Sequence, residues 1–207
     1  MGMNSLLPHD LLWGMTVAEL AADAPAWAIE VVRQGQPVVV RRERLAPERI
    51  AVGIRGARRE QRHAASLPRS AVVRHVRPEQ LIDAQSLRDM PALRALQQIR
   101  PPMHALGLAW GVAGSAGFEL ACGVAALHEG SDLDLIVRTP VCVSRAWAAD
   151  LVAALDSVAC RVDVQLQLPH GALALREWAG ASRQVLLKTC EGAQLLSDPW
   201  QRLQACA

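Results

Sequence analysis

The segment from residue 106 to residue 168 restricts the fold more than any other part of the chain, because strand-like and helix-like stretches alternate along it. Apolar residues at helical spacing mark its helices, and strict alternation of apolar and polar residues marks its last strand. The expected order is strand 106–110, a glycine-rich turn, helix 116–127, strand 131–138, a helix opening at Ser144, strand 161–168, helix 172–178 and strand 183–189. This order predicts an α+β domain with a mixed sheet flanked by helices.

Two aspartates stand two residues apart in the strand expected over 131–138. Because strand side chains alternate between the two faces of a sheet, Asp132 and Asp134 point to the same face. The alternation over 161–168 sends Asp163 to a polar face on the adjacent strand. Carboxylates that converge in this way repel one another unless a cation lies between them. The pattern therefore predicts a metal site.

The carboxylates also indicate which metal it is. A strand advances about 6.6 Å over two residues, and paired catalytic metal ions lie about 3.5–4 Å apart, so Asp132 and Asp134 can bind a metal pair from one side. Asp163 can complete the shell of one ion and accept a proton from an attacking hydroxyl. Hard oxygen ligands without Cys or His favour Mg²⁺ (or Mn²⁺) over zinc.

A glycine-rich turn over 111–117 precedes the first of these helices. Its backbone N–H groups and the Ser115 hydroxyl suit a phosphate, which the helix N-terminus also favours. The candidate phosphate-binding residues are therefore Gly114 and Ser115. The candidate catalytic and metal-binding residues are Asp132, Asp134 and Asp163.

The chain of 207 residues suffices for one ordinary domain or two small ones, and its pattern changes near Pro78. Strand-like runs separated by turn residues come first, at 37–40, 50–54 and 71–76. Over 78–99 we expect a helix, a break at Met90-Pro91 and a second helix. We expect a smaller, mostly β, arginine-rich N-terminal domain over 1–80 and the catalytic domain over 81–207.

Positive charge is concentrated in residues 41–77, which contain eleven Arg and three Glu although the net charge of the whole chain is only +2. Guanidinium groups suit bidentate contact with phosphates or carboxylates. Arg55, Arg59 and Arg62 therefore either contact a polyphosphate or an acidic carrier protein, or form a solvated face.

Several features indicate the compartment. Uncharged stretches are too short or too interrupted to cross a bilayer, and the first residues lack the pattern of a signal peptide. The five cysteines include no C-x-x-C pair, which is typical of free thiols in a reducing compartment. We expect a cytoplasmic protein without a membrane partner.

The order of Gly-Ser, D-x-D and a third Asp resembles the nucleotidyltransferase superfamily. More narrowly, the chain is similar to the phosphoribosyl-dephospho-CoA transferases of malonate decarboxylase, also called its holo-acyl-carrier-protein synthases. The matching stretches are Trp110–Ala121, Ser131–Leu135, Pro8–Trp13, Val52–Gly56 with Arg59 and Arg62, Val162–Gln165 and Asp198–Trp200. The chain departs from the family pattern at Val112-Ala113 and at Cys122.

The resemblance implies a reaction and its partners. The donor is triphosphoribosyl-dephospho-CoA, and the acceptor is a serine of the acyl carrier subunit of malonate decarboxylase. The prosthetic group is transferred and pyrophosphate leaves, with neither nucleic acid nor a membrane involved. In this reaction Asp163 takes the serine proton, and Gly114 and Ser115 hold the outer phosphates.

Two alternatives stay open on the residues alone. One is a nucleotidyltransferase that uses another nucleotide donor and acceptor with the same metal chemistry. The other is a non-catalytic module that binds a nucleic acid or a carrier protein through the basic segment. His9 and Asp10 match the family motif, and we interpret them as a structural cap. Glu119 either contacts the site or is solvated.

Overall fold

The computed structural model describes residues 6–201, which form two β-sheets, each with a hydrophobic core of its own. The N-terminal sheet is antiparallel, in the order β4-β3-β2-β1-β5. Its strands are β1 (Leu11–Trp13), β2 (Val38–Val40), β3 (Arg49–Arg55), β4 (Arg62–Pro68) and β5 (Arg74–Val76). Helix α1 (Ala26–Arg33) and two 3₁₀ turns, η1 (Val17–Glu19) and η2 (Arg69–Ala71), complete this domain.

The two faces of the N-terminal sheet have different roles. Along β3, Ile50, Val52 and Ile54 are buried in the N-terminal core, where α1 covers the sheet. The alternate residues, Gly53 and Arg55, lie on the opposite face, which looks toward the C-terminal domain. This period of two is the ordinary consequence of the pleated strand.

The C-terminal sheet is mixed, in the order β11-β10-β9-β8-β7-β6, and only β7 and β8 pair in parallel among the described strands. Its strands are β6 (Trp110–Val112), β7 (Leu133–Arg138), β8 (Val162–Leu168), β9 (Gly171–Ala174), β10 (Val185–Thr189) and β11 (Gly192–Leu196). Its helical elements are η3 (Pro78–Leu81), α2 (Pro91–Ala105), α3 (Gly114–Cys122), α4 (Arg145–Leu155) and α5 (Leu175–Ala179).

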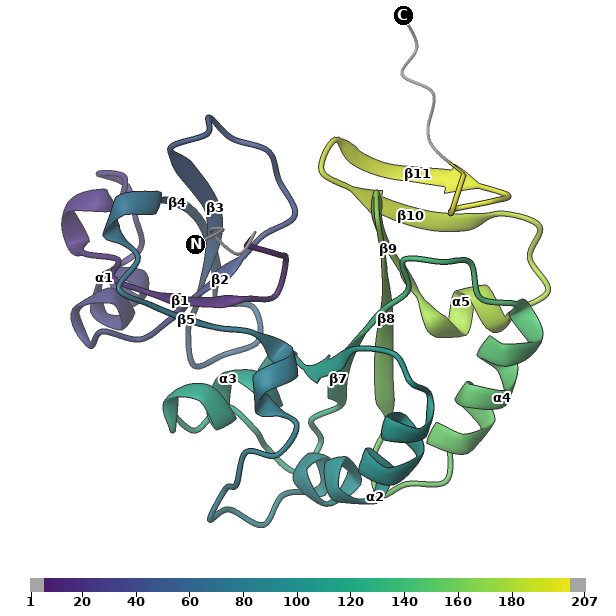
Figure 1. Ribbon diagram of the computed structural model, residues 1–207. Helices are drawn as coiled ribbons and strands as arrows, with labels where there is room; N and C mark the ends of the chain where they lie inside the picture. Colours follow the sequence, from purple (N-terminus) through teal and green to yellow (C-terminus); the bar gives the residue numbers. More distant parts are fainter. Residues whose placement is uncertain (1–5, 202–207) are drawn as a thin grey trace, which may run out of the picture.

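Helices cover one face of this sheet and leave the other face toward the N-terminal domain (Figure 1). Three apolar residues of β7, Leu133, Leu135 and Val137, are at most 1% exposed and belong to the C-terminal core. Figure 1 shows α4 and α5 on one side of β8 and β9, and the N-terminal sheet on the other side. Polar residues of β7 and β8 therefore face the space between the two sheets.

The predicted α+β class, with a β-rich domain preceding a mixed sheet flanked by helices, is confirmed. The helix predicted to open at Ser144 does so, since the Ser144 hydroxyl accepts a hydrogen bond from the backbone N–H of Trp147 at 3.0 Å. The domain boundary at residue 80 stays a prediction. No helix in residues 6–201 has the length and apolar character needed to cross a membrane.

Three predicted elements are wrong. The helix predicted over 172–178 is instead strand β9 followed by the short α5, because a turn after Leu168 lets this segment pair with β8. The helix predicted from Pro78 is only the 3₁₀ turn η3, and the strand predicted over 106–110 begins at Trp110 because α2 continues to Ala105. For β9, tertiary pairing outweighs local propensity.

Candidate active site

The parallel pairing of β7 and β8 brings two of the predicted carboxylates together. Asp134 and Asp163 are register partners across these strands, and both are partly buried. Burial raises the pKa of Asp134 to about 6, and the negative charges of Asp163 and Asp132 add to the shift. Asp132 lies just before β7 and acts on Asp134 through its charge. The repulsion expected from the sequence is therefore present.

The donor set suits a hard divalent cation. Two neighbouring carboxylates, one with a raised pKa, gain from a positive charge placed between them. Among residues 6–201, however, no three His, Cys, Asp or Glu side chains are grouped closely enough to hold a metal ion. The binding of Mg²⁺ or Mn²⁺ by all three aspartates stays a prediction.

The glycine of the Gly-Ser pair lies directly against Asp134. Gly114 begins α3 with a φ of +58°, and a Cβ at this position would lie 1.8 Å from Asp134 Oδ2. The backbone N–H of Ala113 donates to the Asp134 carbonyl oxygen at 2.9 Å. Any side chain at 114 would displace the carboxylate, so glycine is required here by both conformation and space.

An arginine of the N-terminal sheet reaches across to this turn. Arg55 Nη2 donates to Ser115 Oγ at 2.6 Å and to the Ala126 carbonyl oxygen at 3.3 Å, and its guanidinium lies 5.5 Å from the centre of the Phe118 ring. The other two predicted arginines stand close by, since Arg59 acts to lower the pKa of Asp134 and Asp134 acts to raise that of Arg62. The structure thus brings the predicted arginines, the Gly-Ser turn and Asp134 into one neighbourhood.

A cavity of about 340 Å³ contains Asp134 and Asp163 together with three cations that the sequence analysis missed. These cations are Arg161, Arg176 and Lys188. Arg161 Nε lies 3.0 Å from Asp163 Oδ1. Arg161 comes just before β8, two residues from Asp163, so period-two alternation predicts that both lie on one face and this neighbour was readable from the sequence. Lys188, the single lysine of the chain, comes from β10, and no local pattern joins it to the aspartates.

His9, interpreted from the sequence as part of a structural cap, instead faces the site. It has a φ of 77°, lies before β1, and lines both this carboxylate cavity and a second cavity. Burial lowers the pKa of His9 to about 4, with a further contribution from the positive charge of Arg42. The imidazole is therefore neutral at neutral pH. Local sequence carries no signal for this conformation, which is uncommon outside glycine.

Asp10, the neighbour of His9, holds the turn in place. Asp10 is fully buried, and its Oδ2 accepts a hydrogen bond from the Leu7 backbone N–H at 2.9 Å and lies 2.7 Å from His75 Nε2. The interpretation as a structural residue thus suits Asp10, whereas His9 faces the cavities.

Glu119 lies on α3 but is neither solvated nor directed into the carboxylate cavity. It is 4% exposed, and its Oε2 accepts hydrogen bonds from the backbone N–H groups of Ala126 and Leu127 and from Arg88. Although burial acts to raise its pKa, these hydrogen bonds lower it overall. Glu119 fixes the loop after α3, whose Ala126 carbonyl oxygen Arg55 contacts.

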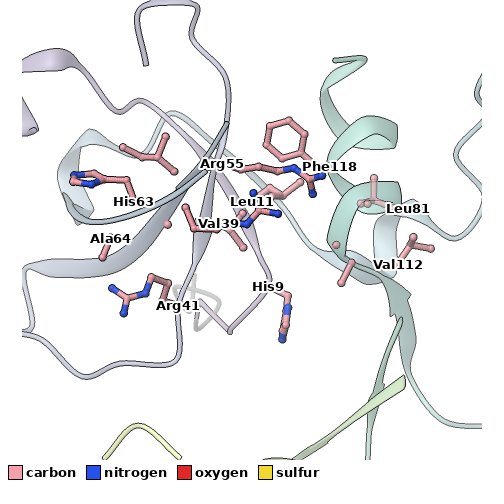
Figure 2. Close-up of a pocket in the computed structure, with 16 residues that line it drawn as sticks. His9, Leu11, Val39, Arg41, Arg55, His63, Ala64, Leu81, Val112 and Phe118 are labelled. Carbon is pink, nitrogen blue, oxygen red and sulfur yellow. The ribbon is translucent and has the colours of Figure 1, made fainter. Parts of the chain in front are cut away.

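The second cavity, of about 460 Å³, lies between the two sheets and shares Gly114, Ala113 and His9 with the carboxylate cavity. Figure 2 shows Leu11 and Val39 from the N-terminal sheet on one side of it, and Leu81, Val112 and Phe118 from the C-terminal domain on the other. The candidate site therefore has two adjoining compartments, one carrying carboxylates and the other mostly apolar.

Comparison with known proteins covers almost the whole chain. Residues 80–199 match the family model described as "Phosphoribosyl-dephospho-CoA transferase MdcG C-terminal domain", and residues 7–78 match its N-terminal domain. A phosphoribosyl-dephospho-CoA transferase of Pseudomonas syringae pv. tomato is 59% identical over 98% of this chain and 97% of its own length. The phosphoribosyl-dephospho-CoA transferase of Pseudomonas fluorescens is 58% identical over 100% of this chain and 99% of its own length. That of Pseudomonas aeruginosa is 52% identical over 94% of this chain and 93% of its own length. No solved structure matches.

Proposed function

Because the chain belongs to the phosphoribosyl-dephospho-CoA transferase MdcG family, we propose that it attaches the phosphoribosyl-dephospho-CoA group to a serine of the malonate decarboxylase acyl carrier protein. The donor in this proposal is triphosphoribosyl-dephospho-CoA, and pyrophosphate is the second product. The enzyme is a transferase, and the absence of a C-x-x-C pair among its cysteines supports a cytoplasmic location in this proposal.

One observation carries the proposal. Asp134 and Asp163 lie side by side on parallel strands, and Gly114 of the Gly-Ser turn touches Asp134. A phosphate at the N-terminus of α3 would therefore meet backbone N–H groups and both carboxylates at once. Phosphoryl transfer depends mostly on such positioning and charge neutralisation.

The proposed step is a displacement at phosphorus. The serine oxygen of the carrier bonds to the phosphorus atom next to the ribose, and the bond from that phosphorus to the bridging oxygen breaks. The electron pair of this bond leaves with pyrophosphate. The serine proton passes to a carboxylate oxygen of Asp163, which is partly exposed and so reachable by a protein substrate.

Asp132, Asp134 and Asp163 are the residues that would hold Mg²⁺ or Mn²⁺. When bound, such ions neutralise charge on the transferred phosphate and on the leaving pyrophosphate. Without them, the carboxylates repel each other, as the raised pKa of Asp134 indicates.

The arginines of the N-terminal sheet position the polyphosphate in this proposal. Arg55 is half-buried and already hydrogen-bonded to Ser115, so its charge is held at the turn before any ligand arrives. Burial lowers the pKa of both Arg55 and Arg62, and neighbouring guanidinium groups lower it further. A bound polyphosphate would relieve this repulsion among cations.

The test is the intact mass of the carrier subunit after incubation with the enzyme, triphosphoribosyl-dephospho-CoA and Mg²⁺. We expect the carrier to gain the mass of one prosthetic group, with one pyrophosphate released per carrier. A carrier modified only by ATP or another nucleotide would favour the nucleotidyltransferase with a different donor. A carrier that binds the enzyme but gains no mass with any donor would favour the non-catalytic module.

A further inference from the structure

We propose that the apolar cavity between the two sheets binds the adenosine end of the donor, so that the base lies against the N-terminal sheet and the phosphates extend toward the Gly-Ser turn. The inference rests on the proposed function for the identity of the donor. It assigns a nucleoside site to the cavity between the two domains, apart from the carboxylates.

The floor of this cavity is one continuous row across four neighbouring strands. Leu11 pairs with Val39, Val39 with Gly53, and Gly53 with Ala64. All four residues line the cavity, and the two smallest are neighbours at its outer end. A row with Gly and Ala at these positions is flat, which leaves room for a planar group to lie on the sheet.

Neither backbone conformation nor crowding requires a glycine at position 53. Its φ does not fall in the left-handed region, and a Cβ there would meet only ordinary contacts, the nearest being the Arg41 side chain at 3.5 Å. A glycine within a strand weakens the strand and often marks a close approach by a ligand. Here the space that a side chain would fill is the cavity itself.

The opposite wall comes from the C-terminal domain. Phe118 on α3, Val112 on β6 and Leu81 on η3 line the cavity and are buried. Figure 2 shows these three facing Leu11 and Val39 across the cavity. A flat aromatic group is thus enclosed on both faces by apolar surface, which is the usual environment of a bound base.

The positive charges of two arginines indicate how the ligand would be oriented in the cavity. Arg55 and Arg62 are cross-strand partners, and both line the apolar cavity. Arg55 contacts Ser115, so this part of the cavity adjoins the Gly-Ser turn. Gly114 belongs to both cavities. A ligand with a base on the flat floor and an anionic group attached to it would therefore reach the arginines, the turn and then the carboxylates.

The pantetheine arm of the donor is a poorer occupant. Its two amide groups need hydrogen-bond partners when buried, whereas the two facing walls are built from Leu, Val, Gly, Ala and Phe. The polar side chain of Arg41 lies on the side away from Leu81 and Val112 (Figure 2), where it suits the nitrogen-bearing edge of a base.

The test places a larger side chain on the floor of the apolar cavity. Gly53→Val adds a β-branched side chain that suits a strand, and Ala193→Val on the exposed strand β11 is the matched control. The probes are ADP and 4′-phosphopantetheine, measured by calorimetry, together with the donor KM in the carrier assay. We expect Gly53→Val to weaken ADP binding and raise the donor KM at least tenfold, with 4′-phosphopantetheine binding unaffected and no effect of Ala193→Val.

The inference is overturned if folded Gly53→Val binds ADP and uses the donor within twofold of wild type, or if the variant blocks 4′-phosphopantetheine instead of ADP. Should Gly53→Val not fold, Ala64→Leu tests the same row, because Ala64 is exposed on edge strand β4. If wild type binds ADP and the variants do not, while no carrier is modified, the proposed function fails and the nucleoside site stands.

Discussion

The two sheets that face each other across the site contribute opposite kinds of side chain. The C-terminal sheet places Asp134 beside Asp163 on a parallel strand pair, and the N-terminal sheet places Arg55 opposite Arg62 on an antiparallel pair. In each sheet the register puts like charges together, which costs energy in isolation. Each sheet therefore supplies the counter-charge of the other.

Under the proposed function, the division also separates chemistry from recognition. The carboxylates lie on the sheet that is backed by α4 and α5 (Figure 1). The small residues and arginines lie on the other sheet, whose open face lines the apolar cavity. Changes in the C-terminal sheet should therefore alter turnover, and changes in the N-terminal sheet should alter binding.

The largest effect is expected for Asp134→Asn. The substitution preserves shape but removes a charge from the carboxylate pair, so we expect transfer to fall at least ~10²-fold, the scale for a preorganised electrostatic contact. The measurement is carrier modification by mass spectrometry, with Asp150→Asn on the exposed face of α4 as control. Near wild-type transfer by Asp134→Asn would show that the C-terminal sheet does not carry the chemistry.

The same variant should gain stability in EDTA. The pKa of Asp134 is about 6 in the folded protein, against 3.8 for an unperturbed aspartate, so wild type loses stability relative to Asp134→Asn as pH rises from about 4 to about 6. A pKa difference of this size corresponds to at most roughly 3 kcal/mol. Thermal or urea unfolding at pH 4 and pH 8 tests this, and equal stability of the two proteins at pH 8 would contradict it.

A smaller effect is expected in the N-terminal sheet. Arg55→Ala removes the contacts with Ser115 and Ala126, so the donor KM should rise about tenfold, equivalent to 1.4 kcal/mol, with a smaller loss of kcat. The triple change of Arg55, Arg59 and Arg62 to Ala should raise it further, and Arg33→Ala on α1 is the control. Unchanged kinetics in the triple variant would mean that these arginines do not contact the donor.

The smallest effect concerns the turn between the sheets. His9 adopts a φ that glycine accepts readily, so His9→Gly should be more stable than His9→Ala by about 1 kcal/mol. Thermal melts of the two variants measure this difference directly. A more stable His9→Ala would mean that this turn changes conformation when the imidazole is removed.

How far the sequence could predict this site depends on distance along the chain. The D-x-D pair, the Gly-Ser turn and Asp163 follow from period-two alternation and from the order of strands and helices, and the structure places Asp134 and Asp163 in register. Arg55 and Ser115 are 60 residues apart, and only the docking of two separate sheets joins them. The left-handed turn at His9 and the replacement of a predicted helix by β9 likewise depend on tertiary contacts that no local pattern contains.

The connection between the sheets has a consequence for how the proposed donor would be held. Strand β5 ends at Val76, η3 begins at Pro78, and Gly111 lies so close to Pro78 that a Cβ there would be 2.3 Å from the Pro78 carbonyl carbon. This connector is short and seated on β6, so the arginines are tethered to the turn at a high effective concentration, of millimolar order for short linkers. Two halves made as separate chains would have to be mixed at such concentrations to recover the donor affinity of the intact protein.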